Sequence, residues 1–130
     1  MKKDINPSKV ENVVVAIVKE KNEEDKYVWN AYLLNLNDYA IDTVLVSTKG
    51  YSPTKKTTQL RHFLGEIPAK NYKKIEPLMD DVFALTNEFW VSFNRNNEML
   101  DKKYIFVPGS ISDKLLTQVP LMNNKGIIHM

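Results

Sequence analysis

The sequence predicts an all-β protein, a β-sandwich of about seven strands in a single domain. The first observation is that apolar and polar residues alternate over residues 27–35 and again over residues 82–93. A period of two is typical of a half-buried strand, because successive side chains point to opposite faces. The second observation is that strand-like segments recur about every dozen residues with turn residues between them, which is typical of a sandwich or barrel. The length of 130 residues suits one domain.

Each N-terminal strand is predicted from its own composition. Residues 10–20 would also form a helical stripe, but their run of β-branched residues favours a pleated strand. Residues 27–36 and 40–48 form a hairpin across a turn that contains Asn37 and Asp38. Residues 57–64 alternate, although Leu60, Phe63 and Leu64 would also line one side of a helix that ends at Gly65. We predict a strand there.

Prolines and polar turns delimit the later strands. Pro77 prevents residues 70–86 from forming one helix, because proline lacks the N–H and clashes one turn back, so residues 72–76 are predicted as a short strand. The longest strand covers residues 82–93, and the last one ends near Phe106. Ser112 is expected to cap a single helical turn. These regular short strands favour an immunoglobulin-like sandwich over residues 10–121, with a flexible N-terminal arm (1–9) and a C-terminal tail (122–130).

The alternation also assigns an inner face to each strand, which should form the core. The predicted inner residues are Val13, Val15, Ile17, Trp29, Leu33, Val44, Val46, Leu85, Phe89, Val91 and Phe106. Glu88 lies on the opposite face of its strand, next to Trp90, and we expect its carboxylate to be hydrated.

Composition excludes several classes of site. The chain has no cysteine and two histidines, His62 and His129, so neither a disulfide nor a zinc site with the usual ligand spacing is expected. The four glycines are far apart, which excludes a P-loop or a dinucleotide-binding turn. We therefore predict no cofactor and no metal. The apolar run at residues 13–18 is too short to cross a membrane, and a cytoplasmic location is the default expectation.

No pattern in the sequence is typical of catalysis. The serines lack a G-x-S-x-G elbow, and the adjacent carboxylates Asp80 and Asp81 sit in a predicted turn, where they are solvated. An enzyme of unknown class built around Arg61, His62 and Glu88 remains a hypothesis. It requires these three side chains to meet in one cleft.

Charge is unevenly distributed along the chain, although the net charge is only +2. Residues 51–75 hold six basic residues and one acidic residue, whereas residues 76–101 hold one basic and six acidic residues. Such segregation favours steering or head-to-tail contacts between proteins. The basic segment also interleaves aromatic residues, which is a pattern of single-stranded RNA binding. The alternative is that its lysines protect edge strands from aggregation.

Short segments over nearly the whole chain carry a resemblance. They are residues 28–33 (VWNAYL), 49–51 (KGY), 68–70 (PAK), 87–89 (NEF) and 103–106 (KYIF), together with Thr57, Arg61 and His62. They resemble a family of small bacterial β-sandwich proteins, some of which are labelled phenylalanyl-tRNA synthetase alpha-like. The chain is too short for a class II synthetase core and lacks a matching arginine pattern for ATP, so no functional residue is carried over.

These observations favour a non-catalytic, cytoplasmic protein-interaction module or the subunit of a homo-oligomer. The partner is an unknown protein or a second copy of the chain. RNA binding through residues 51–75 is the first alternative, and the enzyme hypothesis is the second. The candidate interaction surface consists of Tyr51, Lys55, Lys56, Arg61, His62, Lys73, Lys74 and Trp90. An exposed Trp90 would mark a protein-binding patch.

Overall fold

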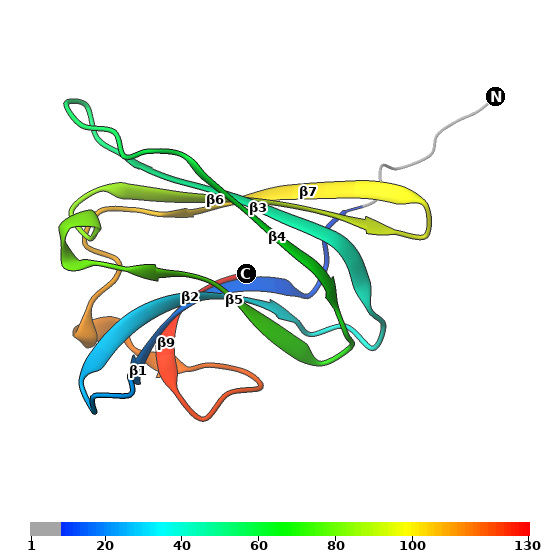
Figure 1. Ribbon diagram of the computed structural model, residues 1–130, viewed down its shortest axis with the longest axis horizontal. Helices are drawn as coiled ribbons and strands as arrows, with labels where there is room; N and C mark the ends of the chain where they lie inside the picture. Colours follow the sequence, from blue (N-terminus) through cyan, green and yellow to red (C-terminus); the bar gives the residue numbers. More distant parts are fainter. Residues whose placement is uncertain (1–8) are drawn as a thin grey trace.

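The computed structural model describes residues 9–130 as two antiparallel β-sheets that face each other across one apolar core (Figure 1). The strands of the five-stranded sheet lie in the order β5 (Asn71–Leu78), β2 (Tyr27–Asn35), β1 (Val13–Lys21), β9 (Lys125–His129) and β8 (Thr117–Gln118). Those of the four-stranded sheet lie in the order β4 (Leu60–Ile67), β3 (Ile41–Tyr51), β6 (Thr86–Arg95) and β7 (Glu98–Phe106). The prediction of a single all-β domain is confirmed.

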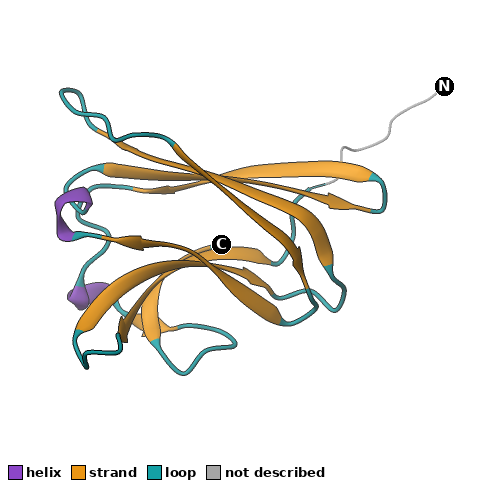
Figure 2. Ribbon diagram, viewed as in Figure 1, coloured by secondary structure: helices purple, strands orange, loops and turns teal. Residues whose placement is uncertain are grey.

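In the described part of the chain, the helical content is limited to two 3-10 turns (Figure 2), Asp80–Val82 and Asp113–Leu115. The side chain of Ser112 accepts a hydrogen bond from the backbone N–H of Lys114, so the predicted cap is present. Within residues 9–130, no helix is long and apolar enough to cross a membrane.

Alternating side chains of both sheets form the core, as the period of two predicts. Most of the predicted inner residues lie in its main cluster, but Trp29 is only partly buried against it and Leu85 is buried outside it. Phe89 and Phe106 pack edge to face with their ring centroids 5.7 Å apart. Tyr104 is fully buried, and its hydroxyl donates a 2.6 Å hydrogen bond across the sandwich to the carbonyl of Val13. This bond joins the two sheets at a polar point inside an apolar layer.

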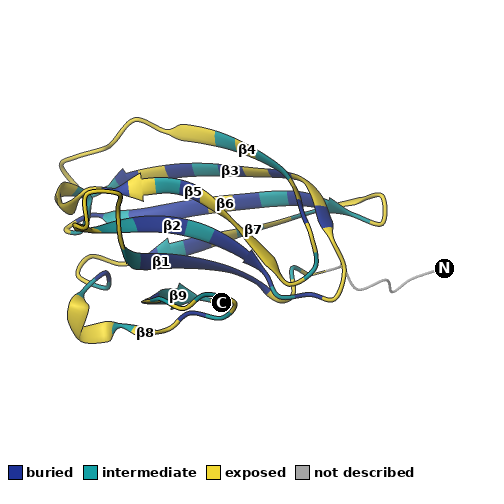
Figure 3. Ribbon diagram, turned by 60° about the horizontal axis from the view of Figure 1, so that its bottom comes forward, coloured by how far each residue is buried: buried dark blue, intermediate teal, exposed yellow. Residues whose placement is uncertain are grey.

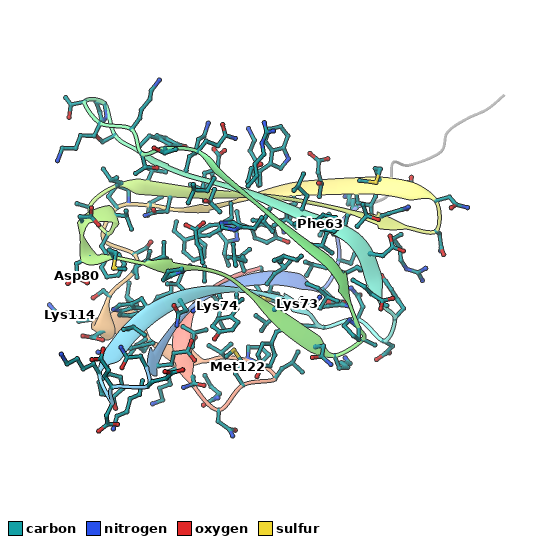
Figure 4. All side chains as sticks on the ribbon, in the orientation of Figure 1. Phe63, Lys73, Lys74, Asp80, Lys114 and Met122 are labelled. Carbon is teal, nitrogen blue, oxygen red and sulfur yellow. The ribbon has the colours of Figure 1, made fainter. Side chains whose placement is uncertain are left out.

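A second, smaller core covers the outer face of the five-stranded sheet. Its buried members are Val14, Ala16, Val18, Leu34 and Val119. Residues 119–124, between β8 and β9, fold back over this face, and Met122 packs against the cluster (Figure 4). Residues 13–18 are therefore buried on both sides of the sheet, which explains why that stretch is continuously apolar rather than alternating.

The C-terminal residues belong to the sandwich. The sequence places residues 122–130 in a tail and counts about seven strands, whereas the structure has nine among the described residues, and β9 pairs with β1. The ring of His129 on β9 packs edge to face against Tyr104 and Phe106. Apart from Lys9, the predicted N-terminal arm lies outside the described residues.

Strand boundaries differ from the prediction by up to four residues, and two of these differences concern the candidate sites. The predicted strand at residues 57–64 is present, but it runs from Leu60 to Ile67. The strand predicted from residue 82 begins only at Thr86, after a compact turn. The side-chain amide of Asn87 donates to the carbonyls of Val82 (2.8 Å) and Leu85 (3.3 Å). These bonds satisfy carbonyls that a strand ladder would otherwise use, so the turn replaces the start of the strand.

Candidate functional site: an open sheet face and an inter-sheet cleft

The outer face of the four-stranded sheet carries exposed apolar side chains, and we call it the open face. Leu45, Phe63, Trp90 and Met99 are exposed on it by 37%, 70%, 44% and 61%. The strand register places them together. Leu45 on β3 pairs with Phe63 on β4 and with Ser92 on β6, and Trp90 lies two residues before Ser92 on the same face of β6. Figure 3 shows that β4, at the edge of this sheet, is mostly exposed or half-buried. A shallow hollow of about 340 Å³ runs over the open face between Trp90 and Met99.

Trp90 is held in a fixed orientation at the centre of the open face. Its indole N–H donates a 2.7 Å hydrogen bond to Asp101 Oδ2 on the neighbouring strand. The ammonium of Lys103 lies 4.7 Å from the centroid of the Trp90 ring, on the same strand as Asp101. A ring fixed on two sides loses little side-chain entropy when a partner covers it.

Glu88 corrects one prediction for this face. The sequence suggests a hydrated carboxylate, but the side chain is only 10% exposed. It pairs in register with Lys49, and the ammonium of Lys49 lies 3.7 Å from Glu88 Oε2. A cross-strand pair of opposite charge thus shields the carboxylate.

Of the eight predicted interaction residues, the structure places two, Arg61 and Trp90, in the hollow of the open face. These two residues lie on either side of Ser47. The other predicted residues are dispersed. Tyr51 ends β3, Lys55 and Lys56 lie in the loop after it, and Lys73 and Lys74 lie on β5 in the opposite sheet (Figure 4). The basic segment therefore does not form one face.

His62 points the other way, into the space between the sheets. Its Nε2 lies 2.6 Å from Oε1 of Glu76 on β5. Arg61 pairs with Ser47, and Glu88 pairs with Lys49 on the other side of β3. The structure does not gather Arg61, His62 and Glu88 in one cleft, as the enzyme hypothesis requires.

A polar cluster that the sequence did not indicate lies beside His62. The hydroxyl of Thr48 donates a 2.7 Å hydrogen bond to the same Glu76 Oε1, and Thr48 is 4% exposed. Glu76 turns inward because the β2–β5 register shifts at Ala31 and Tyr32, a bulge that places both Ile75 and Glu76 toward the other sheet. The alternation of apolar and polar residues in the sequence does not predict such a bulge. A cleft of about 250 Å³ opens next to this cluster.

A second hydrogen-bonded group lies on the outer side of the five-stranded sheet. Glu20 Oε2 accepts from Asn30 Nδ2 at 2.7 Å and from Tyr32 Oη at 2.6 Å. Burial, and then the hydrogen bond to the Glu20 carboxylate, raise the pKa of Tyr32 well above its ordinary value. The hydroxyl of Tyr32 thus stays protonated and acts as a fixed donor, which suits a structural cross-strand link.

Within the described part of the chain, no three His, Cys, Asp or Glu side chains are arranged to hold a metal ion. No family model, curated protein or solved structure matches this chain.

Proposed function

We propose that this chain is a protein-interaction module that self-associates, and that the open face is the contact between two copies. The observation that carries the proposal is the difference between the two outer faces. Val119 and Met122, between β8 and β9, cover part of the outer face of the five-stranded sheet, whereas no described residues pack over Phe63, Trp90 and Met99. Contiguous exposed apolar side chains on a folded monomer mark interaction sites.

The residue types on the open face support this role. Tryptophan, phenylalanine, methionine and arginine are enriched in protein interfaces, and tryptophan and arginine dominate binding hot spots. Trp90 and Arg61 lie on either side of Ser47 in one row of register pairs, and the row continues from Trp90 to Lys103 on β7. Leu45 and Phe63 form the adjacent row.

Charge complementarity favours a second copy as the occupant. Arg61 lies on β4 at one edge of the sheet, and Asp101 lies on β7 at the other edge. A two-fold axis along the strands, midway across the sheet, brings β4 of one copy over β7 of the other. Arg61 is in register with Lys103 of β7, and Asp101 lies two residues along β7 from Lys103, within the span of an arginine side chain. The same ion pair then forms twice.

The size of the open face sets the expected affinity. Four strands about 4.8 Å apart, with about eight residues each at about 3.3 Å, cover roughly 500 Å² of sheet. Two such faces bury roughly 1,000 Å² in total, at the lower limit for specific interfaces. We therefore expect a reversible dimer with a dissociation constant in the micromolar range.

Sedimentation equilibrium over about 5–500 µM protein tests the proposal. The parent chain should change from monomer to dimer across this range, and Phe63→Ser should weaken the dimer at least about tenfold because it removes the most exposed large apolar side chain of the open face. Tyr27→Ser is the matched control, since Tyr27 is 64% exposed but lies on the five-stranded sheet. A parent chain that stays monomeric throughout, or equal weakening by both substitutions, would overturn the proposal.

Two finer expectations belong to the same proposal. The immunoglobulin-like assignment is supported by the strand order, because β2 lies beside β5 in one sheet while β3, β6 and β7 adjoin in the other. Here β4 extends the second sheet beside β3, and β8 and β9 extend the first beyond β1. We also propose a cytoplasmic location, which the cysteine-free composition supports.

A further inference from the structure

The cleft between the sheets is a second hollow, separate from the open face. It lies next to β4 and β5, the two edge strands that face each other across the sandwich. Its floor is polar, with Thr48, Glu76 and Asn87. Its walls are mainly apolar and include Leu60, Pro77, Leu78, Met79, Val82 and Phe89. Leu60 and Met79 line this cleft but remain 46% and 66% exposed, so neither side chain fills it.

The hydrogen bonds of Glu76 use one of its carboxylate oxygens and leave the other as an acceptor at the floor of the cleft. A carboxylate only accepts, so Nε2 of His62 donates to it, as does the hydroxyl of Thr48. Both bonds end on Oε1, and no described residue donates to Oε2. The Glu76 side chain is 13% exposed, and Oε2 is reached by solvent, because Asn94 Oδ1 is the only buried side-chain nitrogen or oxygen without a partner among the described residues. An accessible carboxylate oxygen beside apolar walls favours a ligand that supplies a donor.

The amide donors of the floor are already used. Both N–H bonds of the Asn87 amide are committed, to the carbonyls of Val82 and Leu85. The backbone N–H of Gly50 is committed to Oγ1 of Thr57. The charged side chains of the lining are three carboxylates, Glu76, Asp81 and Glu88, and one ammonium, Lys49, which lies 3.7 Å from Glu88 Oε2. A carboxylate or phosphate ligand would therefore meet a lining of net negative charge.

We infer that this cleft binds a small primary ammonium ion that carries a compact apolar body. An ammonium group has three donors and no acceptor, which complements this floor, and its charge complements Glu76. The hydrocarbon part would contact Leu60, Leu78 and Phe89. The volume of about 250 Å³ holds about eight water-sized groups at about 30 Å³ each. A phenyl or short alkyl group on a two-carbon amine fits this space.

Titration of isotope-labelled protein with 2-phenylethylammonium, followed by amide chemical shifts, tests the inference. 2-Phenylethanol has the same body with a neutral head, and phenylacetate has an anionic head. We expect saturable shifts at Thr48, Thr58 and Glu76 with the amine, at least tenfold weaker binding of the alcohol, and no binding of the acid.

Three variants locate the binding and separate it from a purely structural role. Glu76→Gln keeps an oxygen for Thr48 and His62 but removes the charge, so amine binding should fall at least tenfold. Glu66→Gln, at an exposed position of β4, is the matched control and should bind as the parent chain does. Thr58→Trp adds bulk at an exposed lining position and should block the amine while Glu76 stays intact.

Each result of these experiments either supports or overturns the inference. Equal binding of amine and alcohol, or no shift with about 10 mM amine, would show that the Glu76 cluster only links the two sheets. Undiminished binding by Thr58→Trp would place the ligand elsewhere and also overturn the inference. If Glu76→Gln fails to fold, the ligand series on the parent chain and the Thr58→Trp variant still decide.

Discussion

Phe89 shows how one side chain holds the two sheets together. It is 1% exposed and lies in the main core cluster, with the ring of Phe106 edge to face. Phe89→Ala should lower the free energy of unfolding by about 3–5 kcal/mol, because lost burial and a residual cavity add. Urea denaturation measures this change.

Phe63→Ala provides the matched control for that measurement. Phe63 is 70% exposed on the open face, so its truncation should change the free energy of unfolding by less than about 0.5 kcal/mol. The measurement must be made at a protein concentration where the chain is monomeric. Similar losses for both phenylalanines would contradict the assignment of inner and outer faces.

The buried hydroxyl of Tyr104 makes the free energy of unfolding depend on pH. Burial raises the pKa of its hydroxyl well above the ordinary value of 10.0. Above about pH 10 the unfolded chain therefore releases this proton while the folded chain retains it, so stability falls as pH rises. Tyr104→Phe should reduce that alkaline loss, although it costs about 1–3 kcal/mol at pH 8 by leaving the Val13 carbonyl without its donor.

The check is a comparison of unfolding free energies at pH 8 and about pH 10.5 for both chains. The parent chain should lose more stability over this interval than Tyr104→Phe does. An equal loss in both would show that the phenol of Tyr104 ionises in the folded state as it does in the unfolded chain.

At the scale of the element, β9 depends on one close approach of backbones. A Cβ at Gly126 would lie 2.5 Å from the carbonyl oxygen of Ile17 and 3.0 Å from the Cα of Val18. Gly126→Ala should therefore force β9 away from β1 and lower stability by at least about 2 kcal/mol. Hydrogen exchange should show lost amide protection in β9 and on the facing side of β1.

Lys125→Ala is the control in the same strand. Lys125 is exposed, so this substitution should leave amide protection near that of the parent chain. Retained protection of β9 in Gly126→Ala would contradict the geometry of the β1–β9 contact.

The longer strands could be predicted from the sequence, either from alternation or, for residues 13–18, from β-branched composition. Of the inner residues predicted in residues 27–35 and 86–93, Leu33, Phe89 and Val91 lie in the main core, whereas Trp29 is only partly buried against it. β9 was not predicted, because five residues with a glycine carry too little pattern to distinguish a strand from a tail. Its position depends on the contact between Gly126 and the β1 backbone, which no local pattern encodes.

The candidate sites were predictable only in part, for a related reason. Trp90 could be predicted as a surface residue because the alternation of its strand places this large aromatic side chain on the outer face. Glu76 was missed because a bulge moves it to the inner face, and Thr48 was missed because its role depends on Glu76 from the other sheet. Sequence spacing carries no information about which edge strands oppose each other.

At the scale of the whole molecule, reversing the charge of Arg61 or of Asp101 tests the proposed two-fold arrangement of the dimer. Arg61→Glu and Asp101→Arg should each weaken the dimer, because each places like charges opposite each other at both ends of the interface. A mixture of the two variants should form heterodimers, since Glu at position 61 then meets Arg at position 101 at one end and Arg61 meets Asp101 at the other. Sedimentation of the separate and mixed proteins measures this difference.

Trp90 needs a separate control, because Asp101→Arg removes the acceptor of its indole N–H. Asp101→Asn keeps an oxygen at that position and removes only the charge, so it should weaken the dimer less than Asp101→Arg does. No association in the mixture would contradict the proposed two-fold pairing, while the open face itself is tested by other means.

Amide chemical shifts recorded during dilution, from about 1 mM to about 20 µM protein, test most directly whether the open face is the contact. The account predicts concentration-dependent shifts confined to the outer side of β4, β3, β6 and β7, centred on Leu45, Phe63 and Trp90. Shifts confined to the five-stranded sheet, or spectra that do not change with concentration, would contradict it.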